Sequence, residues 1–403
     1  MILIAGASLA AGLEITEIDV NVDYDEAYAY RVENRDRIDS ASVPVVNNSK
    51  INVDILPGSN VTFTIRAENT FNGEEPTIKS VFTRIGFVAL VCFEAGVARI
   101  EAQNSNSTVA GWVKYSGNPV LGGDYGTCFD VSVLKEGEVY RMWFSWRPRA
   151  GLGLVESKDG FHWSKPVMAF GPNNASGWED DINRPVVIKQ DGVYRMWYTG
   201  QTNAAKDNGR SWIGYATSSD GVAWKRMSDK PVLSADRAWE KVAVMCPHVM
   251  WDQETKLYRM WYSGGGQREP DAIGYATSPD GLVWNKRDDP ILKPDPNSEW
   301  QQNRVTGCQV IQEDGWFVMF YIGFSNPYHA QIGIARSKNG ITNWQQFPSN
   351  PIIRTEQGQW DADACYKPYV LFDGKQWLLW YNGRRAQFEQ IGVAMHEGRE
   401  LGF

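Results

Sequence analysis

The sequence has few cysteines and no cluster of metal-binding side chains. Its 403 residues include five Cys and four His, and no CxxC motif or Cys/His cluster occurs among them. This usage excludes a disulfide scaffold and a zinc site. No Lys/Arg cluster is interleaved with aromatic residues and the net charge is −8, so nucleic acid is not an expected partner. No stretch reaches the roughly 18 consecutive apolar residues of a membrane span.

Aromatic residues, in contrast, are abundant and recur in a fixed pattern. There are 18 Trp, 17 Tyr and 16 Phe. Five copies of an MWYxG-like motif begin 54, 64, 59 and 60 residues apart. Aromatic and β-branched runs that recur at this period, separated by Gly and Asp turns, are typical of β-propeller blades. The copies occupy residues 141–146, 195–200, 259–264, 318–323 and 378–383.

A second motif follows each copy and predicts how the ring closes. It ends in an Asp-Gly or Asn-Gly type of turn, which is a strong hairpin signal. Four copies continue into a Trp and a Pro-apolar pair, whereas the fifth does not, and an unattached tail of this kind occupies residues 112–121. We expect this tail to supply the outer strand of the last blade, which removes the open edges of the ring. The sequence therefore predicts an all-β protein with a five-bladed β-propeller at residues 109–403.

The first 108 residues lack the repeated motifs. Residues 1–12 resemble the apolar core and cleavage site of a signal peptide without its basic start, which predicts a secreted, periplasmic or cell-surface protein. Short alternating runs between Asn, Pro and Gly turns at residues 13–84 favour a small Ig-like β-sandwich. Residues 85–108 form an apolar segment and linker, interpreted either as the last strand of the small domain or as an internally fused leader.

Candidate site residues lie at the starts of the inner strands. The first strand of each blade lines the central channel, so polar side chains at these starts converge. Carboxylates that share a small rim with bases have their pKa values pushed apart, as acid/base cleavage of a glycosidic bond requires. The acidic candidates are Asp130, Asp180, Asp181, Asp361 and Asp363, and the basic ones are Arg184, His248, Arg304 and Lys367.

Several candidates also have a structural interpretation. Glu179 and Glu240 each follow a Trp just before an inner strand, so a role in linking blades by hydrogen bonds competes with catalysis. Asp130 has no counterpart at the aligned position of the other blades, which favours a catalytic role. His248 is either a ligand contact or a satisfied core histidine. Arg384 departs from the other blades and is expected at the rim of a binding site.

Taken together, these motifs resemble a known superfamily. The sequence DGVYRMWYTG…IGYATSSDGVAW…PVL within residues 109–403 is similar to the five-bladed glycoside hydrolases of families 43, 32 and 68, with relatives such as family 130. The resemblance implies Asp130 as base, Asp181 as orienting carboxylate and Glu240 as general acid. The sequence departs from the family pattern at Val131, where Pro is usual, and at Met245, where the acid is usual.

We therefore expect an enzyme that cleaves a furanoside or related glycan, with an oligo- or polysaccharide substrate. Two alternatives stay open: phosphorolysis, with clustered cations holding phosphate, and sugar binding without catalysis. Relatives carry a channel Ca²⁺, but no acidic loop here requires one, so no cofactor or metal is expected. The repeat indicates no particular oligomeric state. The expected substrate-binding residues are Arg184, His248, Arg304, Lys367, Asp363 and Arg384.

Overall fold

The computed structural model divides the chain into two compact units, Met1–Ser105 and Asn106–Phe403. The second unit is described at residues 107–202, 210–266 and 270–403. In the first unit the structure describes the backbone of six strands: β1 (Leu13–Asp23), β2 (Ser40–Pro44), β3 (Asn60–Asn69), β4 (Thr77–Arg84), β5 (Ala89–Glu94) and β6 (Val97–Ala102). The predicted signal-like residues 1–12 lie outside the described part. No helix of the described residues is long and apolar enough to cross a membrane.

The first unit contains an antiparallel sheet in the order β2-β1-β3-β4 and a separate pair, β5-β6. The pairing of β1 with β3 shifts its register between Ile15 and Glu17. The predicted apolar segment thus holds a strand pair. The Ig-like sandwich stays a prediction.

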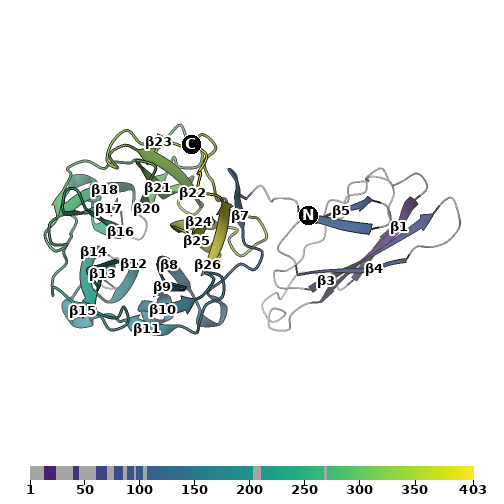
Figure 1. Ribbon diagram of the computed structural model, residues 1–403, viewed down its shortest axis with the longest axis horizontal. Coiled ribbons are helices and arrows are strands. Elements are labelled where there is room, and N and C mark those ends of the chain that lie inside the picture. The colour runs from purple at the N-terminus through teal and green to yellow at the C-terminus, as the bar shows by residue number, and fades with distance from the viewer. Residues whose placement is uncertain are drawn as a thin grey trace. The chain divides into compact units, whose positions relative to one another are not determined.

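The strands of the second unit fall into successive antiparallel groups, which we call repeats 1 to 5. Their first strands β8, β12, β16, β20 and β24 lie toward the centre of a ring in Figure 1. Repeat 1 comprises β8 (Cys128–Glu136), β9 (Val139–Trp146), β10 (Gly151–Ser157) and β11 (Val167–Phe170). Repeat 2 comprises β12 (Asp181–Gln190), β13 (Val193–Gln201), β14 (Ser211–Ser218) and β15 (Lys225–Arg226). Repeat 3 comprises β16 (Ala243–Asp252), β17 (Leu257–Gly265), β18 (Ala272–Ser278) and β19 (Asn285–Lys286).

Repeat 4 comprises β20 (Arg304–Glu313), β21 (Trp316–Phe324), β22 (Ala330–Ser337) and β23 (Gln345–Gln346). Repeat 5 comprises β24 (Ala364–Phe372), β25 (Gln376–Arg385) and β26 (Phe388–Glu397). Its outer strand is β7 (Trp112–Lys114), which pairs antiparallel with β26 and lies beside it in Figure 1. This pairing agrees with the closing strand expected at residues 112–121. The all-β prediction is confirmed.

The repeated tryptophan explains why the aromatic motif recurs. The Nε1 atoms of Trp143, Trp197 and Trp261 each donate a hydrogen bond, 2.8–2.9 Å long, to a turn glycine carbonyl in the following repeat. Trp380 of repeat 5 does the same to Gly160 of repeat 1. Repeat 4 has Phe320 at this position, which carries no donor. Four of the five motifs therefore tie their own repeat to the next one through this hydrogen bond.

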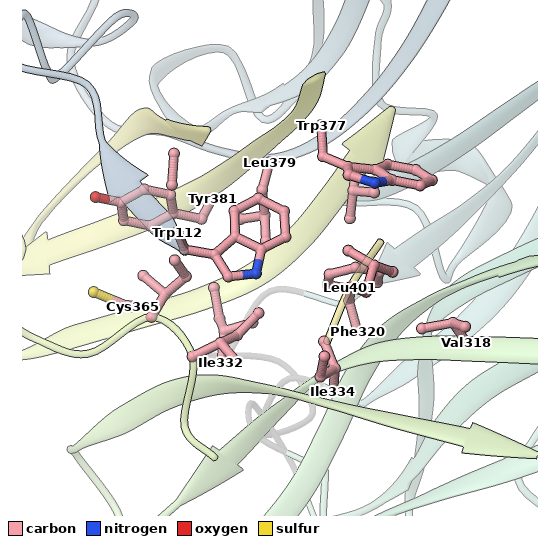
Figure 2. Close-up of a cluster of buried hydrophobic side chains, with 14 residues drawn as sticks. Trp112, Val318, Phe320, Ile332, Ile334, Cys365, Trp377, Leu379, Tyr381 and Leu401 are labelled. Carbon is pink, nitrogen blue, oxygen red and sulfur yellow. The ribbon is translucent and has the colours of Figure 1, made fainter. Parts of the chain in front are cut away.

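The seam between repeats 4 and 5 is filled by Trp112 of the closing strand. Its ring meets Phe320 edge-on, with centroids 6.0 Å apart. Figure 2 shows Trp112 beside Ile332, Leu379 and Tyr381, all of them buried. Burying an aromatic side chain of this size stabilises a fold by about 2–3 kcal/mol. The closing strand is therefore fixed by packing as well as by backbone pairing.

Candidate functional site

Each inner strand carries a β-bulge at an equivalent place, and these bulges define the channel site. The antiparallel register shifts there in all five repeats. One residue of each bulge has a φ between +41° and +55°, a conformation that non-glycine residues adopt rarely and that clusters at functional sites. A bulge re-aims the side chain that it carries. The five residues are Asp130, Arg184, Cys246, Gly307 and Lys367.

The preceding repeat holds most of these bulges by a side-chain hydrogen bond. The acceptor is the residue that follows the aromatic pair of the repeated motif. In repeat 4 this position is occupied by Ile322, whose side chain cannot accept a hydrogen bond. The backbone N–H groups of Asp130, Arg184, Cys246 and Gly307 donate to Asn382 Oδ1, Ser145 Oγ, Thr199 Oγ1 and Ser263 Oγ over 2.8–3.1 Å. In four of the five motifs a small polar residue thus positions a bulge residue of the following repeat.

Asp130 has the most specific surroundings of the predicted residues. Its side chain is buried, at 2% exposure. Asn382 Nδ2 donates to its Oδ1 over 2.7 Å, and Arg184 Nε lies 3.4 Å from its Oδ2. Among the described residues Oδ2 has no hydrogen-bond partner. One oxygen is therefore fixed, while the other faces a guanidinium and is able to accept a proton or a hydrogen bond.

Arg184 is in turn held from the side of repeat 2. Its Nη1 donates to Asn183 Oδ1 at 2.6 Å and to Gln201 Oε1 at 3.3 Å, and Asn183 Nδ2 donates to the same Gln201 oxygen at 2.7 Å. The structure thus brings together the predicted pair Asp130 and Arg184. Sequence reasoning missed Asn382, Asn183 and Gln201. Asn382 could have been found, because it is the amide at a motif position that is otherwise Ser, Thr or Ile.

Lys367 and His248 lie close to each other, but His248 is not a free ligand contact. Burial lowers the pKa of His248 to about 3, and the charge of Lys367 acts in the same direction. The neutral ring contacts Val310 O through Nε2 at 2.8 Å, so Nε2 carries the proton and donates. This contact supports the core-histidine interpretation of the two that were open. Lys367 itself is only 5% exposed.

Two thiols share this part of the channel. Cys246 occupies a bulge position, and Cys308 follows another, Gly307. Burial raises the pKa of Cys308 to about 12, although Lys367 acts against this shift. Because the thiolate is the reactive form of cysteine, Cys308 is an inert wall residue. Among the described residues no group of three or more His, Cys, Asp or Glu side chains could hold a metal ion.

The contacts of Glu240 do not support its predicted role as general acid. It is 0% exposed. Its Oε2 accepts from the backbone N–H groups of Asp236 and Arg237 at 2.7 and 2.9 Å. Tyr262 OH donates to Oε1 at 2.6 Å, and Lys286 Nζ contacts both oxygens at 2.7–2.8 Å. A carboxylate enclosed in this way ties β17 and β19 to the segment that precedes β16 in the same repeat.

A similar lock occurs in repeats 2, 4 and 5, which explains why an acidic residue recurs after Trp. Glu179 Oε1 accepts from Tyr198 OH at 2.6 Å, and Arg226 Nε lies 3.1 Å from both carboxylate oxygens. In repeat 5 Asp361 Oδ2 accepts from Tyr381 OH and from Lys114 Nζ, at 2.9 and 2.6 Å. Repeat 4 has a neutral version, in which Gln301 contacts Tyr321 and Gln346 at 2.9 and 2.7 Å. A structural role therefore accounts for these contacts of Glu179 and Glu240, although the hydrogen bonds lie within one repeat and not between blades.

The remaining predicted residues lie at the ends of strands. Asp181 opens β12, half-buried, and is paired in register with Gln201. Arg304 opens β20, with Nε 3.8 Å from Asp271 Oδ1. Asp363 precedes β24 and accepts from Ala386 N–H at 2.6 Å. Arg384 lies in β25, donates to Tyr328 O, and stands 5.9 Å from the ring centroid of Tyr366.

Most of the second unit matches a known protein family. The model of glycosyl hydrolases family 43 matches residues 116–401. The chain therefore belongs to glycosyl hydrolase family 43, which confirms the predicted superfamily and an enzyme of the glycosidase class.

The curated proteins similar to this chain include a phosphorylase. A 1,2-beta-oligomannan phosphorylase of Thermoanaerobacter sp. is 29% identical over 266 residues, which cover 62% of this chain and 80% of that protein. An uncharacterised protein of Mycobacterium tuberculosis is 28% identical over 279 residues, or 65% of this chain and 89% of that protein.

Two solved structures show the same fold. A thermostable family-43 glycoside hydrolase has a TM-score of 0.56 and 21% identity, covering 71% of this chain and 94% of its own. A structure from the family-130 mannoside phosphorylases, described as containing glycoside hydrolases that target β-1,2 mannosidic linkages in Candida mannan, has a TM-score of 0.59 and 15% identity, covering 73% and 96%.

Proposed function

We propose that residues 109–403 form a five-bladed propeller that cleaves a glycosidic bond of an oligo- or polysaccharide, with Asp130 as the channel base. The arrangement of Asp130 carries the proposal. Asn382 fixes Oδ1, Arg184 faces Oδ2, and the left-handed backbone at φ 50° aims the side chain out of the strand ladder. A buried carboxylate with one oxygen held by a hydrogen bond and the other without a hydrogen-bond partner among the described residues suits removal of a proton from attacking water.

The second carboxylate of this mechanism is then Asp181. It lies two residues before Asn183 on the same strand, so both side chains share a face, and Asn183 contacts Arg184. Two residues of strand span about 6.6 Å, which places Asp181 farther out along the channel wall than the Arg184–Asp130 pair. Hydrolysis with inversion uses two carboxyl groups about 6.5–9.5 Å apart, with water between them. We assign the role of general acid to Asp181 in place of Glu240.

Two substrates that differ in their leaving group test the assignment of Asp181 as general acid. Asp181→Asn should lose about 100-fold or more in kcat on an oligosaccharide, since general acid catalysis contributes about 10²–10⁴-fold. It should lose far less on an aryl glycoside whose nitrophenolate leaves without a proton. Equal losses on both substrates would remove Asp181 from the acid role. Glu240→Gln is the matched variant, and we expect it to cleave both substrates at the wild-type ratio.

Phosphorolysis is the second candidate, and one observation favours it. Arg184 and Lys367, the bulge residues on either side of Asp130 in ring order, are both cations, and clustered cations suit phosphate. Reaction of aryl glycosides and oligosaccharides with and without inorganic phosphate separates the two. We expect turnover that is independent of phosphate. Strict dependence on phosphate would replace hydrolysis by phosphorolysis, and sugar binding without turnover would overturn both.

A further inference from the structure

The channel mouth carries an exposed aromatic ring on a well-ordered loop. Tyr328 lies between β21 and β22, and its side chain is 76% exposed. The loop beneath it is fixed, because Asn326 Oδ1 accepts from the backbone N–H groups of Tyr328 and His329 at 2.9 and 3.0 Å. Ser325 N also donates to His329 O at 3.1 Å. The ring is thus held out in solvent by an ordered backbone.

Contacts with repeat 5 place this ring beside the channel site. Arg384 donates to Tyr328 O, and its guanidinium lies over Tyr366, 5.9 Å from the ring centroid. Tyr366 directly precedes Lys367, the bulge residue of repeat 5. It also pairs in register with Asn382, the residue that fixes Asp130. An unbroken run of contacts therefore leads from Tyr328 along the rim to Asp130.

The polar groups next to Tyr328 suit an uncharged, hydroxylated ligand. Burial lowers the pKa of His329, with Asp363 acting against the shift, so the imidazole is neutral at pH 7. Asp363 is exposed at the start of repeat 5 and close enough to His329 to affect its charge. A sugar ring offers an apolar C–H face to an aromatic ring and hydroxyl groups to such neighbours, and Tyr combines a rigid apolar face with a polar tip.

We propose that Tyr328 is the stacking platform of a second sugar subsite at the rim of repeats 4 and 5, with Asp363 and Arg384 as its polar partners. This subsite binds a neutral pyranose or furanose unit of the glycan beyond the unit that is cleaved in the channel. The inference rests on the proposed function, because it names the residue that makes the same site prefer longer oligosaccharides. Tyr328 touches no reacting atom, so it sets specificity without a part in the chemistry.

The test compares substrates of different length. Tyr328→Ala should raise KM for oligosaccharides of three or more units by about three- to tenfold, the size of one aromatic contact. Its kcat, and both constants for an aryl monoglycoside, should stay at wild-type values. Tyr328→Phe should retain the wild-type KM because stacking needs only the ring. Val283→Ala, at a 70% exposed position in repeat 3, is the matched control and should change neither constant.

The outcomes separate the subsite from the proposed function. If the wild-type protein cleaves oligosaccharides and Tyr328→Ala leaves their KM unchanged, the subsite is overturned and the function stands. An equal loss on the monoglycoside also overturns it, since Tyr328 would then contact the reacting sugar. If the wild-type protein cleaves nothing, the proposed function fails. Titration calorimetry with the same oligosaccharides then tests whether the subsite exists. Weaker binding by Tyr328→Ala than by the wild type supports the subsite, and equal binding overturns it.

Discussion

Arg184 Nε lies 3.4 Å from Asp130 Oδ2, although the two residues belong to different repeats and are 54 positions apart in the sequence. Both occupy bulge positions, and both have positive φ angles. Each residue therefore depends on a neighbouring repeat for its orientation. The pair brings a carboxyl group and a guanidinium from two repeats into contact.

Asp130→Asn is expected to abolish most activity while leaving the fold intact. Asn adopts a left-handed backbone as readily as Asp, so the bulge at φ 50° is preserved. Loss of the base should reduce kcat by about 10²–10⁴-fold. Asp159→Asn is the control, because repeat 4 already carries Asn339 at that turn, accepting from two backbone N–H groups at 2.9 Å. Steady-state kinetics and thermal unfolding check both variants, and an active Asp130→Asn would contradict the assignment.

Glu240→Gln is expected to reduce stability rather than catalysis. It leaves Lys286, which is 5% exposed, with only the exposed Asp236 as a counter-charge, and breaking a buried ion pair costs about 3 kcal/mol. The double variant Glu240→Gln/Lys286→Gln copies the neutral lock of Gln301 and Gln346 in repeat 4. It should recover much of the lost stability.

Tryptophan fluorescence during urea unfolding measures these changes. All 18 Trp residues lie at or beyond position 112, so the signal reports on the second unit alone. A thousandfold loss of kcat in Glu240→Gln at unchanged stability would reinstate the general-acid role that the sequence implied.

His248 should make the second unit less stable in acid. Its pKa falls to about 3 in the folded state, against about 6.5 when unfolded. Between these values the unfolded chain binds more protons, so stability decreases as pH falls from about 6.5 toward 3, by about 1.4 kcal/mol per pH unit. His248→Gln removes the titration and keeps an amide donor for Val310 O, as Gln309 does for Val370 O at 3.0 Å.

Urea midpoints measured from pH 4 to pH 7 check this prediction. The carboxylates contribute equally to both proteins, so the difference between the wild type and His248→Gln isolates the histidine. Parallel curves would show that His248 keeps its ordinary pKa in the folded protein.

Trp112→Ala should weaken closure of the ring. The side chain is 2% exposed and packs on Phe320, and truncation of a buried Trp costs about 3–5 kcal/mol. Trp212→Ala, at a half-buried position of repeat 2, should cost clearly less. The urea midpoints of the two variants give the comparison. Equal losses of stability would mean that Trp112 of the closing strand contributes no more to the fold than a half-buried Trp elsewhere.

The repeat period and the turn motifs predicted the inner strands, the aromatic core and the closing strand, because these depend on local patterns. Asp130 was singled out from sequence as the residue that breaks the repeat, and its catalytic role stays a prediction. The bulges were not predicted, since a positive φ at Arg184 or Lys367 leaves no signal in residues of those types. Glu240 was misjudged because the residue that neutralises it, Lys286, lies 46 positions away and is recognised only once β19 packs beside it.

The pairing of β7 with β26 has a consequence for how the chain folds during synthesis. The closing strand leaves the ribosome about 280 residues before its partner, because Lys114 pairs with Ala394. Its backbone donors and acceptors stay hydrogen-bonded to water until the last repeat has been synthesised. During that time the unpaired strand edge can pair with other chains, which promotes aggregation. Contacts of such high sequence separation form slowly. We therefore expect the late-folding, chaperone-dependent step of this enzyme to be the capture of residues 112–114.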